Sequence, residues 1–154
     1  ARRGAQVVAI DLSPTLVGLA RERMPEDLGR GSIDFRSGDM LAAELGTFDY
    51  VVGMDSLIHY NAKDAVSALS RLSLRTRAAI LFTFAPRTVP LALMHAVGRL
   101  FPRGDRAPAI EPIAVSQLHE LLGSEPTLAG WSAGRTRRIA SGFYTSQALE
   151  LARG

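Results

Sequence analysis

The chain has 154 residues and a formal net charge of +3, from 18 Lys and Arg against 15 Asp and Glu side chains. This length suffices for one domain with a buried core, and 47% hydrophobic with 21% charged residues is an ordinary globular balance. The absence of cysteine excludes disulfides and thiolate metal sites. No signal peptide and no apolar run of about eighteen residues is found, so we expect a soluble cytoplasmic protein.

The surplus of positive charge lies in the second half of the chain. Residues 1–86 carry ten basic and ten acidic side chains, whereas residues 87–154 carry eight basic and five acidic ones. The surplus would suit an anionic substrate, although scattered surface arginines are the simpler explanation. The arginines form no long stripe and aromatic residues are sparse, which argues against nucleic acid as a partner.

The first predicted strand is an apolar run over residues 7–10 that ends on Asp11. Nucleotide-binding α/β folds use a strand of this kind to present a carboxylate to ribose hydroxyls. In such folds it is the second strand, so we expect a first strand and its glycine-rich loop to precede this sequence in a longer protein. Ser13 is placed to cap a helix with Pro14 in its first turn, and Leu16, Val17, Leu19 and Ala20 predict an apolar face for it.

Strands and helices alternate along the rest of the first half. The hydrophobic pattern predicts strands at residues 33–37, 48–54 and 78–84, and a helix at residues 62–72. This alternation predicts a parallel sheet with right-handed crossovers, in which ligands bind beyond the carboxyl ends of the strands. Asp11, Asp39 and Asp55 all fall at such ends.

The second half has a different pattern. It predicts an apolar helix at residues 89–101, a loop at 102–112, a helix at 115–122 and strands at 131–139 and 143–151. Residues 140–142 alone join these two strands, so they form an antiparallel hairpin. A mostly parallel α/β sheet that ends in such a hairpin is the Rossmann-like arrangement of class I S-adenosylmethionine (SAM) methyltransferases. We therefore expect a single methyltransferase domain over residues 1–154, with a substrate-covering insertion over residues 87–125.

Four residues at the first two strand ends are the candidates for binding the nucleoside of SAM. Asp11 would accept hydrogen bonds from the ribose hydroxyls, with Leu12 beside it. Asp39 would lie near the exocyclic amine of adenine, with Met40 against the ring. The alternatives are a surface acid for Asp11 and an ordinary Gly-Asp-Met turn around Asp39.

The segment after the third strand carries the candidates for the reaction itself. Asp55 and Ser56 follow the strand nearest the expected methionine moiety, and a helix cap is the alternative role for Asp55. His59 and Tyr60 lie just beyond, where methyl transfer would occur, so we expect them beside the acceptor. A structural role is the alternative for His59. No two histidines have the spacing of metal ligands, so no protein-bound metal is expected.

Four segments carry a resemblance to a known family: residues 54–60, 84–88, 100–103 and 142–147. In this order they resemble magnesium protoporphyrin IX methyltransferases, the O-methyltransferases of bacteriochlorophyll and chlorophyll synthesis, over essentially the whole chain. The resemblance implies SAM as cosubstrate and Mg-protoporphyrin IX as substrate, whose propionate becomes a monomethyl ester. The magnesium then belongs to the substrate.

The resemblance also implies where the porphyrin binds. Arg87, Arg103 or Arg106 is available to its second propionate, and Tyr144 is expected in the substrate site. The alternative for the segment with these arginines is an amphipathic crossover helix packed on the sheet. The resemblance also suggests that magnesium chelatase subunits deliver the porphyrin. It suggests at most peripheral association of the protein with the photosynthetic membrane.

Three other functions stay open from the sequence. Within methyltransferases, the acceptor could be another small carboxylate or hydroxyl. A non-catalytic methyltransferase-like module is a second alternative. A nicotinamide-dependent oxidoreductase is a third, although the terminal hairpin and the Gly-Asp-Met segment at residues 38–40 argue against it.

Overall fold

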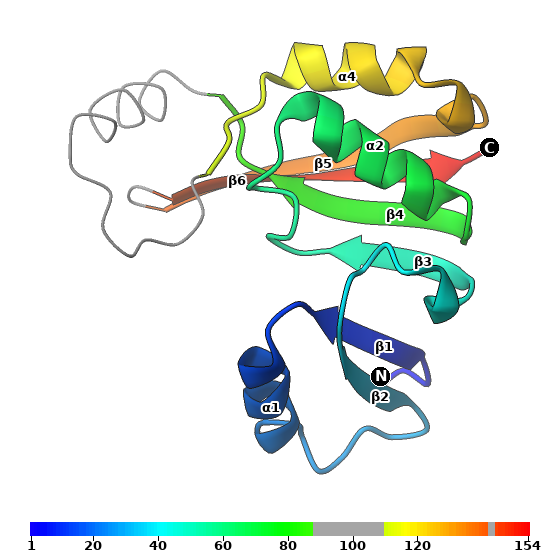
Figure 1. Cartoon of the computed structure of the whole chain (residues 1–154), viewed down its shortest axis with the longest axis vertical. Helices are drawn as coiled ribbons and strands as arrows, with labels where there is room; N and C mark the ends of the chain where they lie inside the picture. The colour runs from blue at the N-terminus through cyan, green and yellow to red at the C-terminus, as the bar shows by residue number, and fades with distance from the viewer. Residues whose placement is uncertain (88–109, 142–143) are drawn as a thin grey trace. The chain divides into compact units, whose positions relative to one another are not determined.

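The structure is a computed structural model that describes residues 1–87, 110–141 and 144–154. The chain forms two compact units, residues 1–46 and residues 47–154. Figure 1 shows the helices and strands of both, and each unit has its own sheet.

The first unit is a β-α-β unit. Its elements are β1 (Gln6–Asp11), α1 (Pro14–Glu22), β2 (Ser32–Ser37) and the short 3-10 helix η1 (Ala43–Leu45). The strands pair in parallel from Gln6 opposite Ser32 to Asp11 opposite Ser37, with α1 as the crossover. Ser13 caps α1 as predicted, because its Oγ accepts a hydrogen bond from the Leu16 N–H at 3.3 Å.

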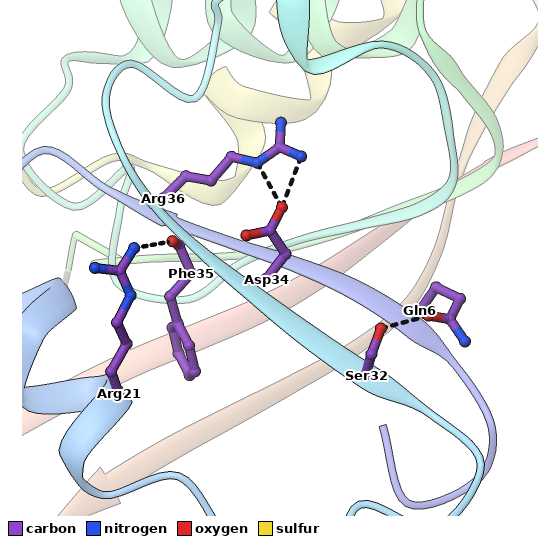
Figure 2. A network of polar contacts seen from close by, with 6 residues as sticks. All are labelled: Gln6, Arg21, Ser32, Asp34, Phe35 and Arg36. Carbon is purple, nitrogen blue, oxygen red and sulfur yellow. Dashed lines mark hydrogen bonds and ion pairs between the residues drawn. The ribbon is translucent and has the colours of Figure 1, made fainter.

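Polar side chains link the elements of this first unit. Figure 2 shows contacts between Arg21 and Phe35, between Ser32 and Gln6, and between Arg36 and Asp34. Arg21, in the last turn of α1, donates to the Phe35 carbonyl and so ties the helix to β2. The contact between Arg36 and Asp34 is a surface ion pair, which contributes little stability.

The second unit holds a four-stranded mixed sheet. Its elements are β3 (Phe48–Gly53), α2 (Ala62–Ser73), β4 (Thr76–Phe84), α4 (Val115–Ser124), the 3-10 helix η2 (Pro126–Leu128), β5 (Trp131–Ser141) and β6 (Tyr144–Arg153). The strand order is β3-β4-β6-β5. β3 and β4 are parallel, whereas β6 runs antiparallel to both β4 and β5. The last strand of the chain therefore lies inside the sheet.

The core of the second unit lies between this sheet and two helices. Figure 1 shows α2 and α4 side by side on one face of the sheet. Phe82 lies opposite Leu149 and Ile80 opposite Leu151, so their side chains share one face. The large apolar side chains that are almost completely buried include Leu57, Leu69, Ile80, Phe82, Phe84, Leu118, Leu149 and Leu151. Burying each such side chain stabilises the fold by roughly 1.5–3 kcal/mol.

The other face of β3 and β4 carries exposed apolar side chains. Tyr50 is 69% exposed, Val52 is 65% exposed and Leu81 is 43% exposed. They alternate along the strands with the core-facing residues, since successive side chains of a strand point to opposite faces. The apolar residues of β3 and β4 are therefore not buried on both faces of the sheet within the second unit.

The predicted strands and helices are found in the described residues, with some boundaries corrected. Ala140 and Ser141 belong to β5 and pair with Thr145 and Tyr144, so the expectation that residues 140–142 form the connection is wrong for these two. β4 begins at Thr76 rather than at residue 78. Its start is fixed because the buried Thr76 hydroxyl donates to the Leu72 carbonyl at 2.8 Å.

The apolar face predicted for α1 is the main correction to expected burial. Val17 is buried, but Leu16 is 54% exposed and Leu19 is 37% exposed. The two-stranded sheet of the first unit covers too little of the helix to bury the full stripe. The helix expected at residues 89–101 lies outside the described residues, and the single-domain organisation stays a prediction.

Candidate functional site

The carboxyl ends of β1 and β2 bring the predicted nucleoside-binding residues together. The Gly38 N–H donates to the Asp11 carbonyl at 3.0 Å, so the end of β2 is joined to the end of β1. Asp11 and Leu12 therefore lie at the same edge of the first unit as Asp39 and Met40. Parallel pairing places both carboxylates at this edge, as the sequence predicted.

Asp11 is held by the turn that follows β1. Its Oδ1 accepts a hydrogen bond from the Ser13 N–H at 2.7 Å, while Ser13 itself caps α1. The residue is exposed, and its second oxygen, Oδ2, has no partner among the residues that the structure describes. Asp11 is thus a carboxylate fixed through Oδ1, and Oδ2 can accept a hydrogen bond from a ligand.

Asp39 is fixed in the same manner at the end of β2. Its Oδ1 accepts from the Leu41 N–H at 2.8 Å, and its carbonyl accepts from the Ala42 N–H at 3.1 Å. These bonds make the Gly-Asp-Met segment a tight turn, with Asp39 exposed and Met40 half-buried. The Gly-Asp-Met turn, which was the alternative role of this segment, is therefore present. It does not prevent a ligand contact, because Asp39 is exposed.

A cavity of about 270 Å³ lies in the first unit between α1 and the two strands. It is lined by Ala9, Ile10, Asp11, Leu16, Val17, Ala20 and Phe35. Asp11 is the charged residue in this lining, and the other six are apolar. The Asp11 carboxylate therefore adjoins an apolar surface.

The loop after β3 carries the second group of candidates. Asp55 has a φ of 50°, in the left-handed region, and follows Met54 directly after the strand. Its N–H donates to the Thr83 hydroxyl at 2.7 Å, and that hydroxyl donates back to Asp55 Oδ1 at 3.0 Å. Asp55 does not cap α2, because Asn61 Oδ1 accepts from the N–H groups of Lys63 and Asp64 at 3.0 Å.

Ser56 lies in the same loop with its hydroxyl turned inward. Its Oγ is buried and has no hydrogen-bond partner among the described residues. A Cβ added to Gly53 would lie 3.0 Å from this oxygen, so the glycine leaves room for Ser56 to fold back over β3. The hydroxyl of Ser56 is directed into the unit, unlike the exposed Asp55 side chain.

His59 and Tyr60 follow on a turn that the core anchors. Leu57 is 1% exposed, and its carbonyl accepts from the Tyr60 N–H at 3.1 Å. His59 is exposed and Tyr60 is half-buried. The Ile58 carbonyl accepts from the Glu111 N–H at 2.8 Å, so this loop is joined to the segment that precedes α4.

The same segment joins the end of β4. The Ile113 N–H donates to the Ala85 carbonyl, and the Arg87 N–H donates to the Ile113 carbonyl, both at 2.8 Å. Arg87 is exposed and lies in the same region as the loop that carries His59. Arg103 and Arg106 lie outside the described residues. Tyr144 is described as the first residue of β6, but not its side chain.

Two carboxylates of the second unit have shifted pKa values, both outside these loops. Hydrogen bonds and the charge of Arg135 lower the pKa of Glu150 to about 2. Hydrogen bonds from Thr127, and a further one from Ser70, hold the pKa of Glu125 below its usual value. The Glu150 shift comes from a contact within the β5–β6 hairpin, and the Glu125 shift comes from contacts at the start of η2.

Two kinds of feature are absent from the residues that the structure describes. No group of three or more His, Asp or Glu side chains in residues 1–87, 110–141 and 144–154 is arranged to hold a metal ion. Within the same ranges, no helix has both the length and the apolar character needed to cross a membrane.

Sequence comparison identifies the family. Residues 53–153 match the family described as magnesium-protoporphyrin IX methyltransferase C-terminus. The chain belongs to the magnesium-protoporphyrin IX methyltransferase family. Residues 1–77 also match the methyltransferase domain family, so the two matches together span nearly the whole chain.

Curated members of this family are similar along the whole chain. The chain is 47% identical over 150 residues to the magnesium-protoporphyrin O-methyltransferase of Rhodobacter capsulatus, with 97% of this chain and 63% of that protein covered. It is 30% identical over 153 residues to the magnesium-protoporphyrin O-methyltransferase of Synechocystis sp. (strain ATCC 27184 / PCC 6803 / Kazusa), with 99% and 65% covered. The chain thus spans slightly less than two thirds of the length of both relatives.

A solved structure of the family has the same fold. The crystal structure of magnesium protoporphyrin IX methyltransferase from Synechocystis PCC 6803 with bound SAH has a TM-score of 0.79 and 31% sequence identity. The match covers 100% of this chain and 67% of that chain. The predicted class I SAM methyltransferase fold, with antiparallel strands at its C-terminal end, is therefore confirmed.

Sequence reasoning missed two contributors to these loops. Thr83 holds Asp55, and its signal was present as the one polar residue in the apolar run over residues 78–84. The pairing of residues 111–113 with the loop after β3 and with the end of β4 had no local signal. It joins segments far apart in the sequence, and no periodicity reports such a contact.

Proposed function

We propose that this protein methylates one propionate carboxylate of Mg-protoporphyrin IX with SAM as the methyl donor, giving the monomethyl ester. The observation that carries the proposal is the family match over residues 53–153. That range includes the loop with Asp55 and His59 and the segment around Arg87. The carboxylates of Asp11 and Asp39 support the cofactor part of the proposal.

The residues at the ends of β1 and β2 fit the nucleoside of SAM. Ribose hydroxyls and the adenine amine are hydrogen-bond donors, and ionised carboxylates only accept. Asp11 would bind the ribose through Oδ2, and Asp39 would bind the adenine amine. Leu12, which is 76% exposed, and Met40 would supply apolar contact to the ring.

The loop after β3 would hold the methionine part of the cofactor. The exposed carboxylate of Asp55 suits the α-ammonium group, since a charge-assisted hydrogen bond is about twice as strong as a neutral one. Ser56 lies beside it, but its buried hydroxyl would have to turn outward to contact a ligand directly.

The reaction requires alignment of the acceptor carboxylate with the methyl group of SAM, and it does not require removal of a proton. A propionic acid has a pKa near that of glutamate, about 4.3, so the acceptor is already ionised at pH 7. SAM supplies an electrophilic methyl group on a positively charged sulfur. The protein has to hold the carboxylate oxygen about 3–3.5 Å from the methyl carbon and to exclude water, because opposite charges are neutralised as the bond forms.

His59 and Tyr60 are the proposed residues beside the acceptor. His59 is exposed on a turn fixed at Leu57 and Ile58, so its imidazole can donate one hydrogen bond that orients the propionate. A tight clamp would stabilise the ground-state carboxylate and slow the transfer, which favours a single contact. Tyr60 would pack beside the bound carboxylate.

Basic residues of the second unit are proposed to bind the other propionate of the porphyrin. Arg87 is exposed, and its backbone is held by Ile113 close to the loop with His59. Arginine matches a carboxylate with two parallel hydrogen bonds. Arg103 and Arg106 are proposed for the same propionate from the sequence. Tyr144 is proposed for the substrate site, and residues 87–125 for covering the substrate.

We also propose that the protein acts in the cytoplasm, at most peripherally attached to the photosynthetic membrane, and receives the porphyrin from magnesium chelatase subunits. The support for this is chemical: a large, flat and apolar macrocycle is poorly soluble and favours direct transfer. Co-sedimentation with vesicles and pull-down with purified chelatase subunits test the two parts separately.

The test of the function is product formation by the complete gene product. The purified protein is mixed with Mg-protoporphyrin IX and SAM that carries an isotope-labelled methyl group. Mass spectrometry should find the label in a porphyrin monomethyl ester. SAM binding without this ester would contradict the substrate and favour another carboxylate or hydroxyl acceptor, and failure to bind SAM would favour a non-catalytic module.

A further inference from the structure

Thr83 is a buried polar residue near the end of an otherwise apolar strand. It is 9% exposed and lies on β4, which Figure 1 shows beside β3. Its hydroxyl accepts from the Asp55 N–H at 2.7 Å and donates to Asp55 Oδ1 at 3.0 Å. One hydroxyl therefore uses both its acceptor and its donor on a single residue 28 positions earlier.

The backbone of Asp55 needs this support. Its φ of 50° places it in the left-handed region, which non-glycine residues adopt uncommonly and aspartate tolerates better than most. The turn redirects the chain directly after β3, where the ladder to β4 ends. The Thr83 oxygen supplies an acceptor for the Asp55 N–H in a part-buried region, where a backbone donor left without a hydrogen bond is costly.

The second bond serves a different purpose. Asp55 is exposed, so water alone could solvate its carboxylate at little cost. A hydrogen bond from a buried hydroxyl adds direction, because it fixes where Oδ1 lies relative to β4. A carboxylate has roughly four lone-pair sites, so it can accept this hydrogen bond together with others.

Thr83 is itself a rigid reference point. β4 is paired on both sides, with Gly53 opposite Phe82 on one edge and Thr83 opposite Ala148 on the other. A β-branched side chain has few accessible χ1 rotamers, and groups placed on strands are held more precisely than groups on loops. Thr83 therefore fixes the position of the Asp55 carboxylate relative to the interior of the sheet.

We propose that Thr83 is a positioning residue, which aims the Asp55 carboxylate at the α-ammonium group of the bound cofactor. This inference rests on the proposed function. Thr83 does not touch the ligand, and it acts through Asp55. Its loss should therefore weaken ligands that carry the ammonium group and spare those that lack it.

The test compares two ligands and four variants of the complete gene product by isothermal titration calorimetry. S-adenosylhomocysteine carries the ammonium group, whereas 5′-methylthioadenosine has the same nucleoside and thioether but lacks the amino-acid part that bears it. Thr83→Val keeps the shape of the side chain and removes both hydrogen bonds. It should weaken S-adenosylhomocysteine about tenfold and leave 5′-methylthioadenosine unchanged, while Thr83→Ser should bind both as the wild type does.

The remaining two variants test the route through Asp55. Asp55→Asn should weaken S-adenosylhomocysteine selectively, as Thr83→Val does. The double variant that combines Asp55→Asn with Thr83→Val should bind this ligand little more weakly than Asp55→Asn alone. Equal weakening of both ligands by Thr83→Val would show a merely structural role and overturn the inference, as would unchanged binding of both. Wild-type protein that fails to bind S-adenosylhomocysteine would instead overturn the proposed function itself.

Discussion

Arg135 and Glu150 form a two-point ion pair across the terminal hairpin, with Nη2 to Oε1 at 2.8 Å and Nε to Oε2 at 2.9 Å. The Arg135 N–H also donates to Oε2, at 3.3 Å. The pair sits where the register shifts between Ala133 and Thr136, so that two residues of β5 face one of β6. A Cβ on Gly134 would lie 3.0 Å from Oε2, and the glycine thus leaves room for the carboxylate.

This ion pair predicts a pH-dependent contribution to stability. The pKa of Glu150 falls from 4.5 to about 2 in the folded protein, chiefly through hydrogen bonds from Arg135. An acid with a lowered folded pKa stabilises the fold above its unfolded pKa and loses this contribution as the pH falls toward the folded value. Glu150→Gln should therefore lower the free energy of unfolding at about pH 7, and the difference from wild type should shrink between about pH 4.5 and about pH 2. Urea denaturation across this range measures it, and a constant difference would contradict the assignment.

Leu69 tests the core between α2 and the sheet. It is 0% exposed, whereas Leu74, just beyond the same helix, is 75% exposed. Leu69→Ala should lower the free energy of unfolding by about 2–5 kcal/mol, because it removes buried contacts and leaves a cavity. Leu74→Ala is the matched control and should change it by less than about 0.5 kcal/mol. If Leu69→Ala lowered the free energy of unfolding as little as Leu74→Ala does, the expected close packing of this core would be contradicted.

Asn61 tests the start of α2, directly after the loop with His59. Its Oδ1 accepts from two helix N–H groups, and its Nδ2 donates to Asp64 Oδ2 at 2.6 Å. Asn61→Ala should lower the free energy of unfolding by about 1 kcal/mol, since these N–H groups lose their partner. Asn61→Ser keeps an oxygen that can accept from the helix N–H groups without placing a second carboxylate beside Asp64, and it should retain most of the stability. Denaturant titration of the three proteins decides the matter.

Asp11 tests the nucleoside site. In Asp11→Asn, the amide oxygen can keep the bond to the Ser13 N–H, while an NH₂ group replaces the oxygen proposed to bind ribose. We expect about tenfold weaker binding of SAM and of 5′-methylthioadenosine, with stability nearly unchanged. Asp34→Asn, which removes an exposed carboxylate on β2 paired with Arg36, is the control and should not affect binding. Unchanged affinity in Asp11→Asn would remove Asp11 from the site.

His59 tests the acceptor side of the proposal. His59→Ala in the complete gene product should lower turnover at saturating substrate about tenfold or more, because the propionate loses the hydrogen bond that orients it. SAM affinity should stay near that of the wild type. His119 is exposed on α4 and serves as the matched control, so His119→Ala should leave turnover unchanged. Near-normal turnover in His59→Ala would exclude His59 from the acceptor site.

Local signals were enough to predict most elements of the fold. Strands that end on Asp11 and near Asp55 are short apolar runs bounded by turn residues, and their periodicity depends on neighbouring residues alone. The cap at Ser13 and the antiparallel terminal strands were equally local. These signals also predicted that Asp11 and Asp39 share a sheet edge, since parallel pairing makes that outcome a matter of topology.

Local sequence patterns were sufficient to predict which segments form strands and helices, which carboxylates follow the strands, and the family. Which apolar residues are buried depends on the tertiary structure: Leu16 lies on the predicted apolar face of α1, yet it is 54% exposed. It also decided that the last strand lies inside the sheet and that Thr83 holds Asp55. Burial and hydrogen bonds between distant residues depend on what lies opposite each side chain, and that information is absent from any short stretch of sequence.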